Sequence, residues 1–291
     1  MKKMVLILSA IIFFSCEKNV DLNISETNPL LTVDAQIEND QYPNVVLTKS
    51  LGYFNNISPQ LLANSFVRNA EVFVSNGVVS QKLKEYPVQV APGFIAYFYS
   101  ADLTNPATAF KGAANTNYSL RVLVDGVEYN ATTIIPALNA TLDSVFVKKA
   151  PQNPDTNKRN LFIRVTDPAG RGNYVRYFTR LNSGPFLAGE NSVFDDQIID
   201  GTTFDVQLSP GIDRNNPPKS DSNFFKRGDT ITMKFCDISK PTYTFWNTWE
   251  FAYQSIGNPF AQPNKVLGNI SNGALGAFCG YAARYRTFVA R

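Results

Sequence analysis

The chain has 291 residues, of which 44% are hydrophobic and 18% charged, with 17 glycines and 17 prolines. This composition is typical of a globular protein, because disordered and collagen-like chains have fewer apolar residues or far more glycine and proline. The chain contains no histidine, which excludes Ser-His-Asp triads, Cys-His pairs and zinc sites that use histidine. Its formal net charge is only +3 and it has no basic run of five residues, so we expect no nucleic-acid binding.

The first 15 residues have the pattern of a signal peptide. Two lysines precede the apolar run from Met4 to Phe14, which is too short to cross a bilayer. The run ends at Ser15-Cys16, and a small residue directly before a cysteine resembles a bacterial lipobox. In that pattern Cys16 is lipidated, becomes the first residue of the mature chain and anchors it to a membrane. The alternative is an unmodified cysteine that ends an ordinary signal or a buried N-terminal helix.

Residues 16–29 are predicted to form a lipidated N-terminus and a short polar tether. Glu17 and Lys18 follow the cysteine directly, and charged residues at this place resemble the sorting signal for the outer leaflet of a Bacteroidota-type outer membrane. A solvated linker is the alternative. No later segment has 18 consecutive apolar residues, so the lipid is the expected membrane attachment.

Residues 30–139 are predicted to form a β-sandwich domain. Apolar and polar residues alternate in several short segments, which is typical of half-buried strands. Asn76-Gly77 and Asp125-Gly126 each separate two such segments and are strong hairpin signals. The expected strands are 31–37, 43–50, 69–75, 78–86, 94–99, 117–125 and 127–134. This pattern matches an antiparallel sandwich of immunoglobulin or transthyretin type, without any helix as long as about ten residues.

Residues 140–291 are predicted to form a second antiparallel β domain. The expected strands are 142–147, 160–166, 173–181, 193–199, 203–208 and 230–238, and 210–222 is expected to be a loop. One face of the 173–181 strand combines aromatic residues with Arg176 and Arg180. Such a face could be a contact surface, but ordinary cross-strand packing with arginine stems covering the sheet is the favoured interpretation.

One amphipathic helix is predicted near 240–256. Ser239 can cap it, Pro241 suits its first turn, and Gly257 can end it. Its apolar stripe comprises Phe245, Trp249, Ala252 and Ile256, widened by Trp246 and Tyr253. Because both tryptophans of the chain lie on this helix, we expect it to pack on the second sheet as core. A ligand-binding aromatic cluster is the alternative.

Several segments together resemble the lipoproteins of the domain of unknown function 4249 family. The resemblance covers nearly the whole mature chain, and its most specific part is the last of these segments. The segments are Cys16, Val20-Asp-Leu, Leu31-Thr-Val-Asp-Ala, Val46-Leu-Thr-Lys-Ser, Tyr53-Phe, Asn69-Ala-Glu-Val-Phe-Val, Tyr118-Ser-Leu-Arg-Val, Ala131-Thr-Thr-Ile-Ile-Pro, Asn258-Pro-Phe-Ala-Gln-Pro-Asn and Asn269-Ile-Ser-Asn-Gly-Ala-Leu-Gly-Ala-Phe. Cys279 departs from the pattern, since a small or polar residue is expected there.

The resemblance implies an outer-membrane lipoprotein that is commonly encoded near TonB-dependent transporters with a carboxypeptidase-regulatory-like plug extension. It implies no catalytic residues, since none are established for the family. We therefore expect a partner that is a β-barrel outer-membrane protein.

Two groups of side chains could carry other chemistry. The acidic residues Asp195, Asp196 and Asp200 are the weak candidates for a metal site, but their spacing matches no EF-hand, so we expect neither a metal nor a cofactor. Cys236 and Cys279 could form a disulfide in an oxidising cell envelope. The sequence leaves that pairing open.

The sequence therefore predicts a non-enzymatic, surface-exposed lipoprotein of the outer membrane. We expect it to act as an accessory or binding subunit of a TonB-dependent transporter or another β-barrel complex. An enzyme that processes glycans or peptides with paired carboxylates is the main alternative, since such chemistry needs no histidine. A structural lipoprotein that faces the periplasm and binds no ligand is the third hypothesis.

Overall fold

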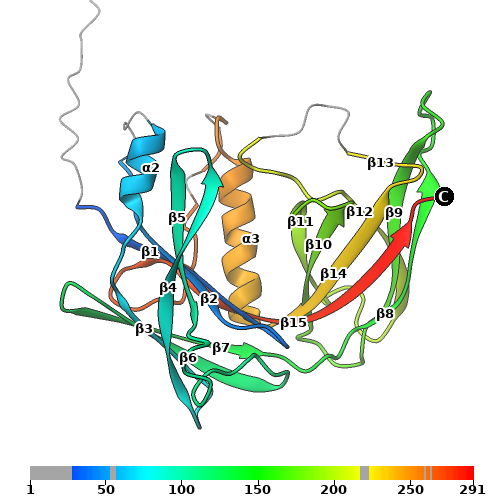
Figure 1. The fold of residues 1–291 in the computed structure, drawn as a ribbon. Coiled ribbons are helices and arrows are strands. Elements are labelled where there is room, and N and C mark those ends of the chain that lie inside the picture. Colours follow the sequence, from blue (N-terminus) through cyan, green and yellow to red (C-terminus); the bar gives the residue numbers. More distant parts are fainter. Residues whose placement is uncertain (1–27, 53–56, 217–222, 259, 263) are drawn as a thin grey trace, which may run out of the picture.

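The computed structural model describes residues 28–52, 57–216, 223–258, 260–262 and 264–291. Within these residues the chain forms fifteen strands and two helices (Figure 1). The mainly β class and the single longer helix near the C-terminus are therefore confirmed.

The first half of the described chain contains seven strands and one short helix. Its elements are β1 (Leu31–Glu38), β2 (Asn44–Lys49), α2 (Pro59–Ser65), β3 (Glu71–Ser75), β4 (Ser80–Ala91), β5 (Phe94–Ala101), β6 (Thr116–Val124) and β7 (Val127–Ile135). Each coincides with or overlaps a predicted strand, apart from α2. Asp125 and Gly126 have φ angles of 50° and 80°, as a type I′ hairpin turn between β6 and β7 requires.

The other predicted hairpin joins β3 to β4, but its loop is longer than the two residues of Asn76-Gly77. Ser75 pairs with Ser80, so the loop runs from 76 to 79. The side chain of Asn76 accepts a hydrogen bond from the N–H of Val79 at 2.8 Å. This contact gives the wider loop its own stable turn.

The second half contains the remaining strands and the longer helix. Its elements are β8 (Thr141–Lys149), β9 (Lys158–Thr166), β10 (Tyr174–Leu181), β11 (Phe186–Asp195), β12 (Thr203–Leu208), β13 (Phe225–Lys226), β14 (Thr230–Ile238), α3 (Lys240–Gln254) and β15 (Leu275–Val289). The strand predicted at 193–199 is displaced, because β11 starts earlier and ends at Asp195. The next residue, Asp196, accepts hydrogen bonds from the backbone of Gly172 and Asn173, and the chain turns there.

The long strand β15 connects the two halves. It pairs in parallel with β1 from Leu275 onward and antiparallel with β14 from Tyr281 onward. These pairings produce one eleven-stranded sheet in the order β11-β10-β14-β15-β1-β2-β5-β4-β3-β6-β7. The sequence did not predict the parallel pair, whereas the other strand pairings are antiparallel as expected. The division into domains at 139–140 stays a prediction. The strand β15 pairs with β1 from the first half and with β14 from the second.

Two of the three hydrophobic cores among the described residues lie between layers of strands, and the third lies beneath α3. In the first, β1 and β2 face β6 and β7 around fully buried side chains such as Leu47, Leu120 and Ile135. In the second, β10 and β14 face a smaller sheet of β8, β9, β12 and β13, with Leu161 and Phe235 inside. Both cores follow from the alternation of the strands, which places every second side chain on the same face.

The helix α3 packs on the outer face of β10, β11 and β15 and stands in the middle of the molecule (Figure 1). Ser239 caps it by accepting the N–H of Thr242, as predicted. The predicted apolar stripe is only partly correct: Phe245 is buried, but Ile256 is 76% exposed. Glu250 is buried in place of Ile256, because its carboxylate has partners on the sheet.

Candidate functional site

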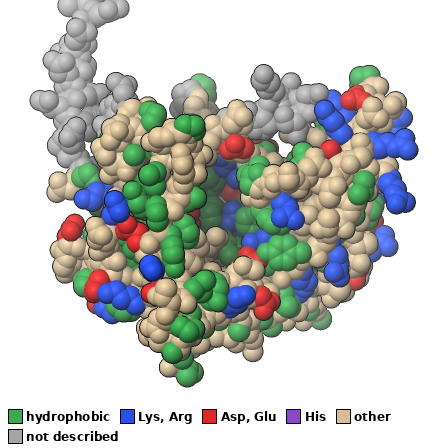
Figure 2. Space-filling view, viewed as in Figure 1, with side chains coloured by type: hydrophobic (Ala, Val, Ile, Leu, Met, Phe, Trp, Pro, Cys, Tyr) green, Lys and Arg blue, Asp and Glu red, His purple; other side chains and the backbone are tan. Residues whose placement is uncertain are grey.

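A cleft of about 850 Å³ lies between α3, β1, β10 and the segment 265–276. Figure 2 shows the surface hollowed beside α3, with apolar and basic side chains inside the hollow. A volume of roughly 300–1,000 Å³ is usual for small-molecule sites. The described residues that line it are Thr32, Val33, Asp34, Arg176, Arg214, Phe245, Trp246, Trp249, Lys265, Val266, Gly268, Ile270, Gly273, Ala274, Leu275 and Gly276.

Arg176 on β10 is the most firmly positioned polar group in the cleft. Its Nε donates to Ser192 Oγ and its Nη1 donates to the hydroxyl of Tyr281, each at 3.0 Å. The guanidinium lies 3.4 Å from the ring centroid of Trp246, which is a close cation–π contact. Its Nη2 has no acceptor among the described residues. The face that the sequence assigned to cross-strand packing therefore also presents a cation to the cleft.

Arg214 brings a second guanidinium to the cleft from the segment that follows β12. Its Nη2 donates to the C=O of Gly189 at 2.8 Å and lies 3.8 Å from a carboxylate oxygen of Glu250. Its Nε is buried and has no partner among the described residues. Burial lowers the pKa of Arg214, and the positive charge of Arg176 lowers it further, against the opposing effect of Glu250. The guanidinium groups of Arg176 and Arg214 are therefore close enough to repel each other, in a part of the cleft that little water reaches.

Glu250 compensates part of this positive charge from the helix. Its two carboxylate oxygens accept from the N–H and the hydroxyl of Ser192 on β11. Because Ser192 also accepts from Arg176, one network links α3, β10 and β11. This network explains why a charged residue occupies the buried face of α3.

Both tryptophans lie on the cleft wall instead of deep in the core. Trp246 and Trp249 are only partly buried and pack at the edge of a hydrophobic cluster. The Nε1 of Trp246 donates a hydrogen bond to the hydroxyl of Tyr281 at 2.8 Å. The rings of Trp249 and Tyr253 stack with their centroids 5.5 Å apart. The core interpretation of the helix is therefore correct for Phe245 and only half correct for the tryptophans.

Asp34 is the single acidic side chain among the described residues that line the cleft. It projects from the outer face of β1, and its carboxylate makes no hydrogen bond or ion pair with another described residue. The side chain of Asp34 is exposed, but the protein around the cleft partly desolvates its carboxyl and raises the pKa of Asp34, while Arg176 acts in the opposite direction. The sequence placed Asp34 on the wet face of its strand, which is correct but did not reveal the cleft above it.

The segment 264–276 forms the remaining wall and contains the most specific part of the family resemblance. It rests on α3 through the hydroxyl of Thr248, which accepts from the N–H of Leu267 at 3.0 Å. It also pairs with β7, where the N–H of Ser271 donates to the C=O of Asn130 at 2.9 Å. The conspicuous Asn-Ile…Gly…Gly sequence therefore builds a wall of the cleft.

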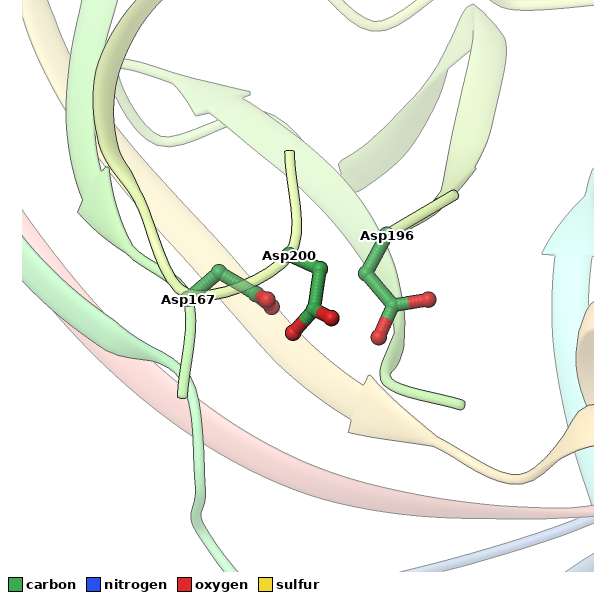
Figure 3. Close-up of side chains that lie close together, drawn as sticks. All are labelled: Asp167, Asp196 and Asp200. Carbon is green, nitrogen blue, oxygen red and sulfur yellow. The ribbon is translucent and has the colours of Figure 1, made fainter. Parts of the chain in front are cut away.

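A second group of polar side chains brings three carboxylates together at Asp167, Asp196 and Asp200 (Figure 3). One oxygen from each lies within 4.8 Å of the others. The sequence identified two of them, missed Asp167 and included Asp195. Asp195 does not belong to this group; its carboxylate accepts a hydrogen bond from the hydroxyl of Tyr243 at 3.2 Å.

The three carboxylates also bind the backbone of neighbouring turns. Asp196 accepts from Gly172 and Asn173, and Asp200 accepts from Gly170. Burial acts to raise the pKa of Asp196, but these N–H donors outweigh it and the pKa lies below its usual value. Burial and the charges of its two neighbours raise the pKa of Asp167. The arrangement ties the turn at 167–173 to the turn at 196–202.

The sequence matches the family described as domain of unknown function (DUF4249) over residues 17–287. The chain belongs to this family. The match covers every described residue that lines the cleft, including those of α3 and the segment 264–276. No curated protein sequence matches the chain.

The two cysteines of the DUF4249 region do not pair in the structure. Cys236 and Cys279 are both free and buried. Cys236 lies opposite Ala283, four positions along β15 from Cys279. At roughly 3.3 Å per residue this offset far exceeds the spacing of about 4–7 Å between the Cα atoms of a disulfide. The pairing that the sequence left open is therefore not formed.

The predicted anchor and sorting residues Cys16, Glu17 and Lys18 lie outside the described residues. Among the described residues, no helix has both the length and the apolar character needed to cross a bilayer.

Proposed function

We propose that this chain is a non-enzymatic lipoprotein of the outer membrane that holds a ligand in the cleft beside α3. In this proposal Cys16 carries the lipid, and Glu17 and Lys18 direct the protein to the outer leaflet. The chain then serves as a binding subunit for a β-barrel partner such as a TonB-dependent transporter.

The observation that carries the proposal is the set of unpaired polar groups in an otherwise apolar cleft. Among the described residues, the Nε of Arg214 is buried without a hydrogen-bond partner, and the Nη2 of Arg176 and the exposed carboxylate of Asp34 form no hydrogen bond either. Unpaired groups of this kind reduce stability when they are shielded from water. A ligand in the cleft would supply partners for Arg176 and Asp34, which favours a binding role, whereas the Nε of Arg214 is closed to the cleft.

The composition of the cleft supports binding over carboxylate-based hydrolysis. Glycoside hydrolysis generally uses two carboxyl groups that flank the scissile bond. Among the described residues the cleft offers one carboxyl, Asp34, facing basic and aromatic side chains. The nearby Glu250 is committed to Ser192.

The lipid anchor is tested by Cys16→Ser in the full chain. We expect the substitution to abolish incorporation of an alkyne fatty acid and to release the protein from the membrane fraction. The two buried cysteines provide the matched control, since Cys236→Ser should leave labelling unchanged. Labelling and membrane retention of the Cys16→Ser protein would contradict the lipoprotein assignment.

Display on the cell surface is tested by adding protease to whole cells. We expect the wild-type protein to be degraded while a periplasmic marker stays intact. Replacing Glu17 and Lys18 by alanine should make the protein protease-resistant until the cells are lysed. Complete protection of the wild-type protein would place it on the periplasmic side.

The partner is tested by cross-linking in whole cells, followed by purification of the tagged chain from solubilised outer membranes. We expect a TonB-dependent transporter to be enriched over a control purification from cells that express the Cys16→Ser protein. Absence of a β-barrel protein, or equal recovery with the unanchored control, would contradict the role as an accessory subunit.

A further inference from the structure

We infer that the cleft beside α3 binds a small organic carboxylate with an apolar body. This inference rests on the proposed binding function and specifies the chemical class of the ligand. It is argued from the charges in the cleft, from its apolar surface and from its size.

Basic side chains outnumber acidic ones among the described residues that line the cleft. Arg176, Arg214 and Lys265 carry the positive charges, and Asp34 carries the single carboxyl. A guanidinium binds a carboxylate with charge-assisted hydrogen bonds that are about twice as strong as neutral ones. The net positive charge therefore favours an anion.

The arginines are prepared for this role by contacts that fix them. Arg176 is held at Nε and Nη1 and by the ring of Trp246, which leaves Nη2 free. Arg214 is held at Nη2 by Gly189; its Nε is buried, so Arg214 contributes its positive charge and not this N–H. Little side-chain entropy is lost when a ligand binds to groups that are already ordered. The geometry therefore suits a carboxylate that contacts a positioned guanidinium.

The rest of the lining is mostly apolar. Phe245, Trp246 and Trp249 supply aromatic surface from α3, and Val266, Ile270, Ala274 and Leu275 supply aliphatic surface from the opposite wall. Inorganic anions such as phosphate would leave this surface in contact with water, whereas an apolar body covers it. The cleft of about 850 Å³ has room for a ring and a short chain.

The two tryptophans provide a direct reporter of this cleft. The chain has only two tryptophans, and both line the cleft. Excitation that is selective for tryptophan therefore reports binding at this place and at no other tryptophan site. The probe must not absorb at the excitation wavelength, a requirement that a phenyl ring meets.

The experiment titrates the lipidated full chain, reconstituted in phosphatidylcholine vesicles, with 4-phenylbutyrate. The matched probe is 4-phenylbutyramide, which has the same ring and chain without the charge. We expect a saturable change in tryptophan emission with 4-phenylbutyrate and an affinity at least about tenfold higher than that of the amide. Vesicles without protein correct for partitioning of each probe into the lipid.

Two charge variants test which groups recognise the carboxylate. Arg214→Gln removes a guanidinium from the cleft, and Lys265→Glu reverses an exposed charge on its wall. Both should weaken binding of 4-phenylbutyrate severalfold and leave binding of the amide unchanged. Lys111→Glu is the control, because this exposed lysine lies outside the cleft. If Arg214→Gln does not fold, Lys265→Glu still tests the inference, since it changes no buried group.

The result that would overturn the inference is equal affinity for the acid and the amide, or no saturable response to either. Unchanged binding of 4-phenylbutyrate by Lys265→Glu and by a folded Arg214→Gln protein would also overturn it. These outcomes are distinguishable from failure of the proposed function. A chain that is lipidated and purifies with a β-barrel partner, but does not prefer the acid, retains its role as a subunit and loses only this ligand class.

Discussion

The side-chain amide of Asn269 forms two hydrogen bonds with the backbone of Phe278 on β15. Its Oδ1 accepts from the N–H of Phe278 at 2.8 Å, and its Nδ2 donates to the C=O of Phe278 at 2.9 Å. β14 pairs with β15 only from Tyr281 onward, so on that side of β15 Phe278 has no strand partner, although β1 lies on its other side. Asn269 therefore replaces a missing strand partner and attaches the cleft wall to the sheet.

We predict that Asn269→Ala loosens this wall and destabilises the protein. The change leaves the N–H and C=O of Phe278 without these partners and also removes a bond from Asn269 to the C=O of Thr132 at 3.1 Å. Losing partners of partly buried backbone groups costs about 1–3 kcal/mol. Denaturant unfolding followed by circular dichroism measures the loss. The same substitution at Asn247, which is exposed on α3, should change the unfolding free energy little, and equal effects at both sites would contradict the prediction.

A second prediction concerns the close contact between β15 and β1 at Gly276. A Cβ at this position would lie 2.0 Å from the carbonyl oxygen of Val33, and the residue has a φ of +94°. Gly276→Ala should therefore separate the two strands at the edge of the cleft. Gly228→Ala is the matched control, because Gly228 has a φ of +95° with nothing within 4 Å.

The difference between these two glycine variants isolates the steric effect from the backbone strain. Strain from a positive φ costs about 1–3 kcal/mol in each protein. We expect Gly276→Ala to lower the thermal midpoint clearly further than Gly228→Ala. Similar midpoints for the two variants would show that the β1–β15 contact adapts to the methyl group.

The strands with strict alternation were predictable from the sequence, while β15 was not. In β1 the apolar residues from Leu31 to Ile37 alternate with polar ones, and the structure buries them as expected. In β15 the stretch from Gly276 to Ala283 sets glycine, alanine and cysteine around Phe278 and Tyr281. Glycine and alanine have low β propensity, and the stretch gives no comparable alternating pattern. Small residues are needed there because neighbouring backbone approaches closely. A Cβ at Gly280 would lie 2.2 Å from the C=O of Ile134.

The candidate site was only partly predictable because its residues come from distant segments. The sequence drew attention to the tryptophans of α3 and to Arg176. It gave no signal for Arg214, because this residue lies in an irregular segment after a strand. It gave none for Asp34 either, because a polar residue on the exposed face of a strand is common and indicates no site. Parallel pairing of β1 with β15 brings Asp34 into the cleft, and such long-range pairing leaves no local pattern.

A third prediction is that Cys236 and Cys279 are unreactive free thiols. Burial raises the pKa of Cys236 to about 12 and that of Cys279 to about 11, and thiols react as thiolates. At pH 8 a thiol reagent should modify neither residue in the folded protein and both after unfolding. Two thiols should be titrated in denaturant without a reductant. Finding none would show that the cysteines are bridged.

The same pKa shifts predict a loss of stability in alkaline solution. In the folded protein these thiols bind their protons more tightly than in the unfolded chain, where the thiol pKa is about 8.5. Their contribution to stability is therefore complete below about pH 8.5 and is lost as pH rises through about 11 for Cys279 and about 12 for Cys236. Cys279→Ala should reduce the slope of unfolding free energy against pH in this range, as measured by denaturant titration. A slope identical to that of the wild type would contradict the assignment.

The last prediction separates the role of Trp249 from that of Phe245 on the same helix. Phe245 is buried in the cluster beneath α3, whereas Trp249 is half-buried on the cleft wall. Truncating a fully buried aromatic residue costs about 3–5 kcal/mol, and a half-buried one loses less contact and creates a smaller cavity. We therefore expect Trp249→Ala to lower the unfolding free energy by less than Phe245→Ala does, although the tryptophan side chain is larger. Denaturant unfolding followed by circular dichroism gives both values without relying on tryptophan emission.

The folded Trp249→Ala protein should also bind 4-phenylbutyrate more weakly, as measured by calorimetry, because the substitution removes part of the apolar wall of the cleft. A loss of stability equal to that of Phe245→Ala, with unchanged binding, would make Trp249 a core residue and remove it from the cleft.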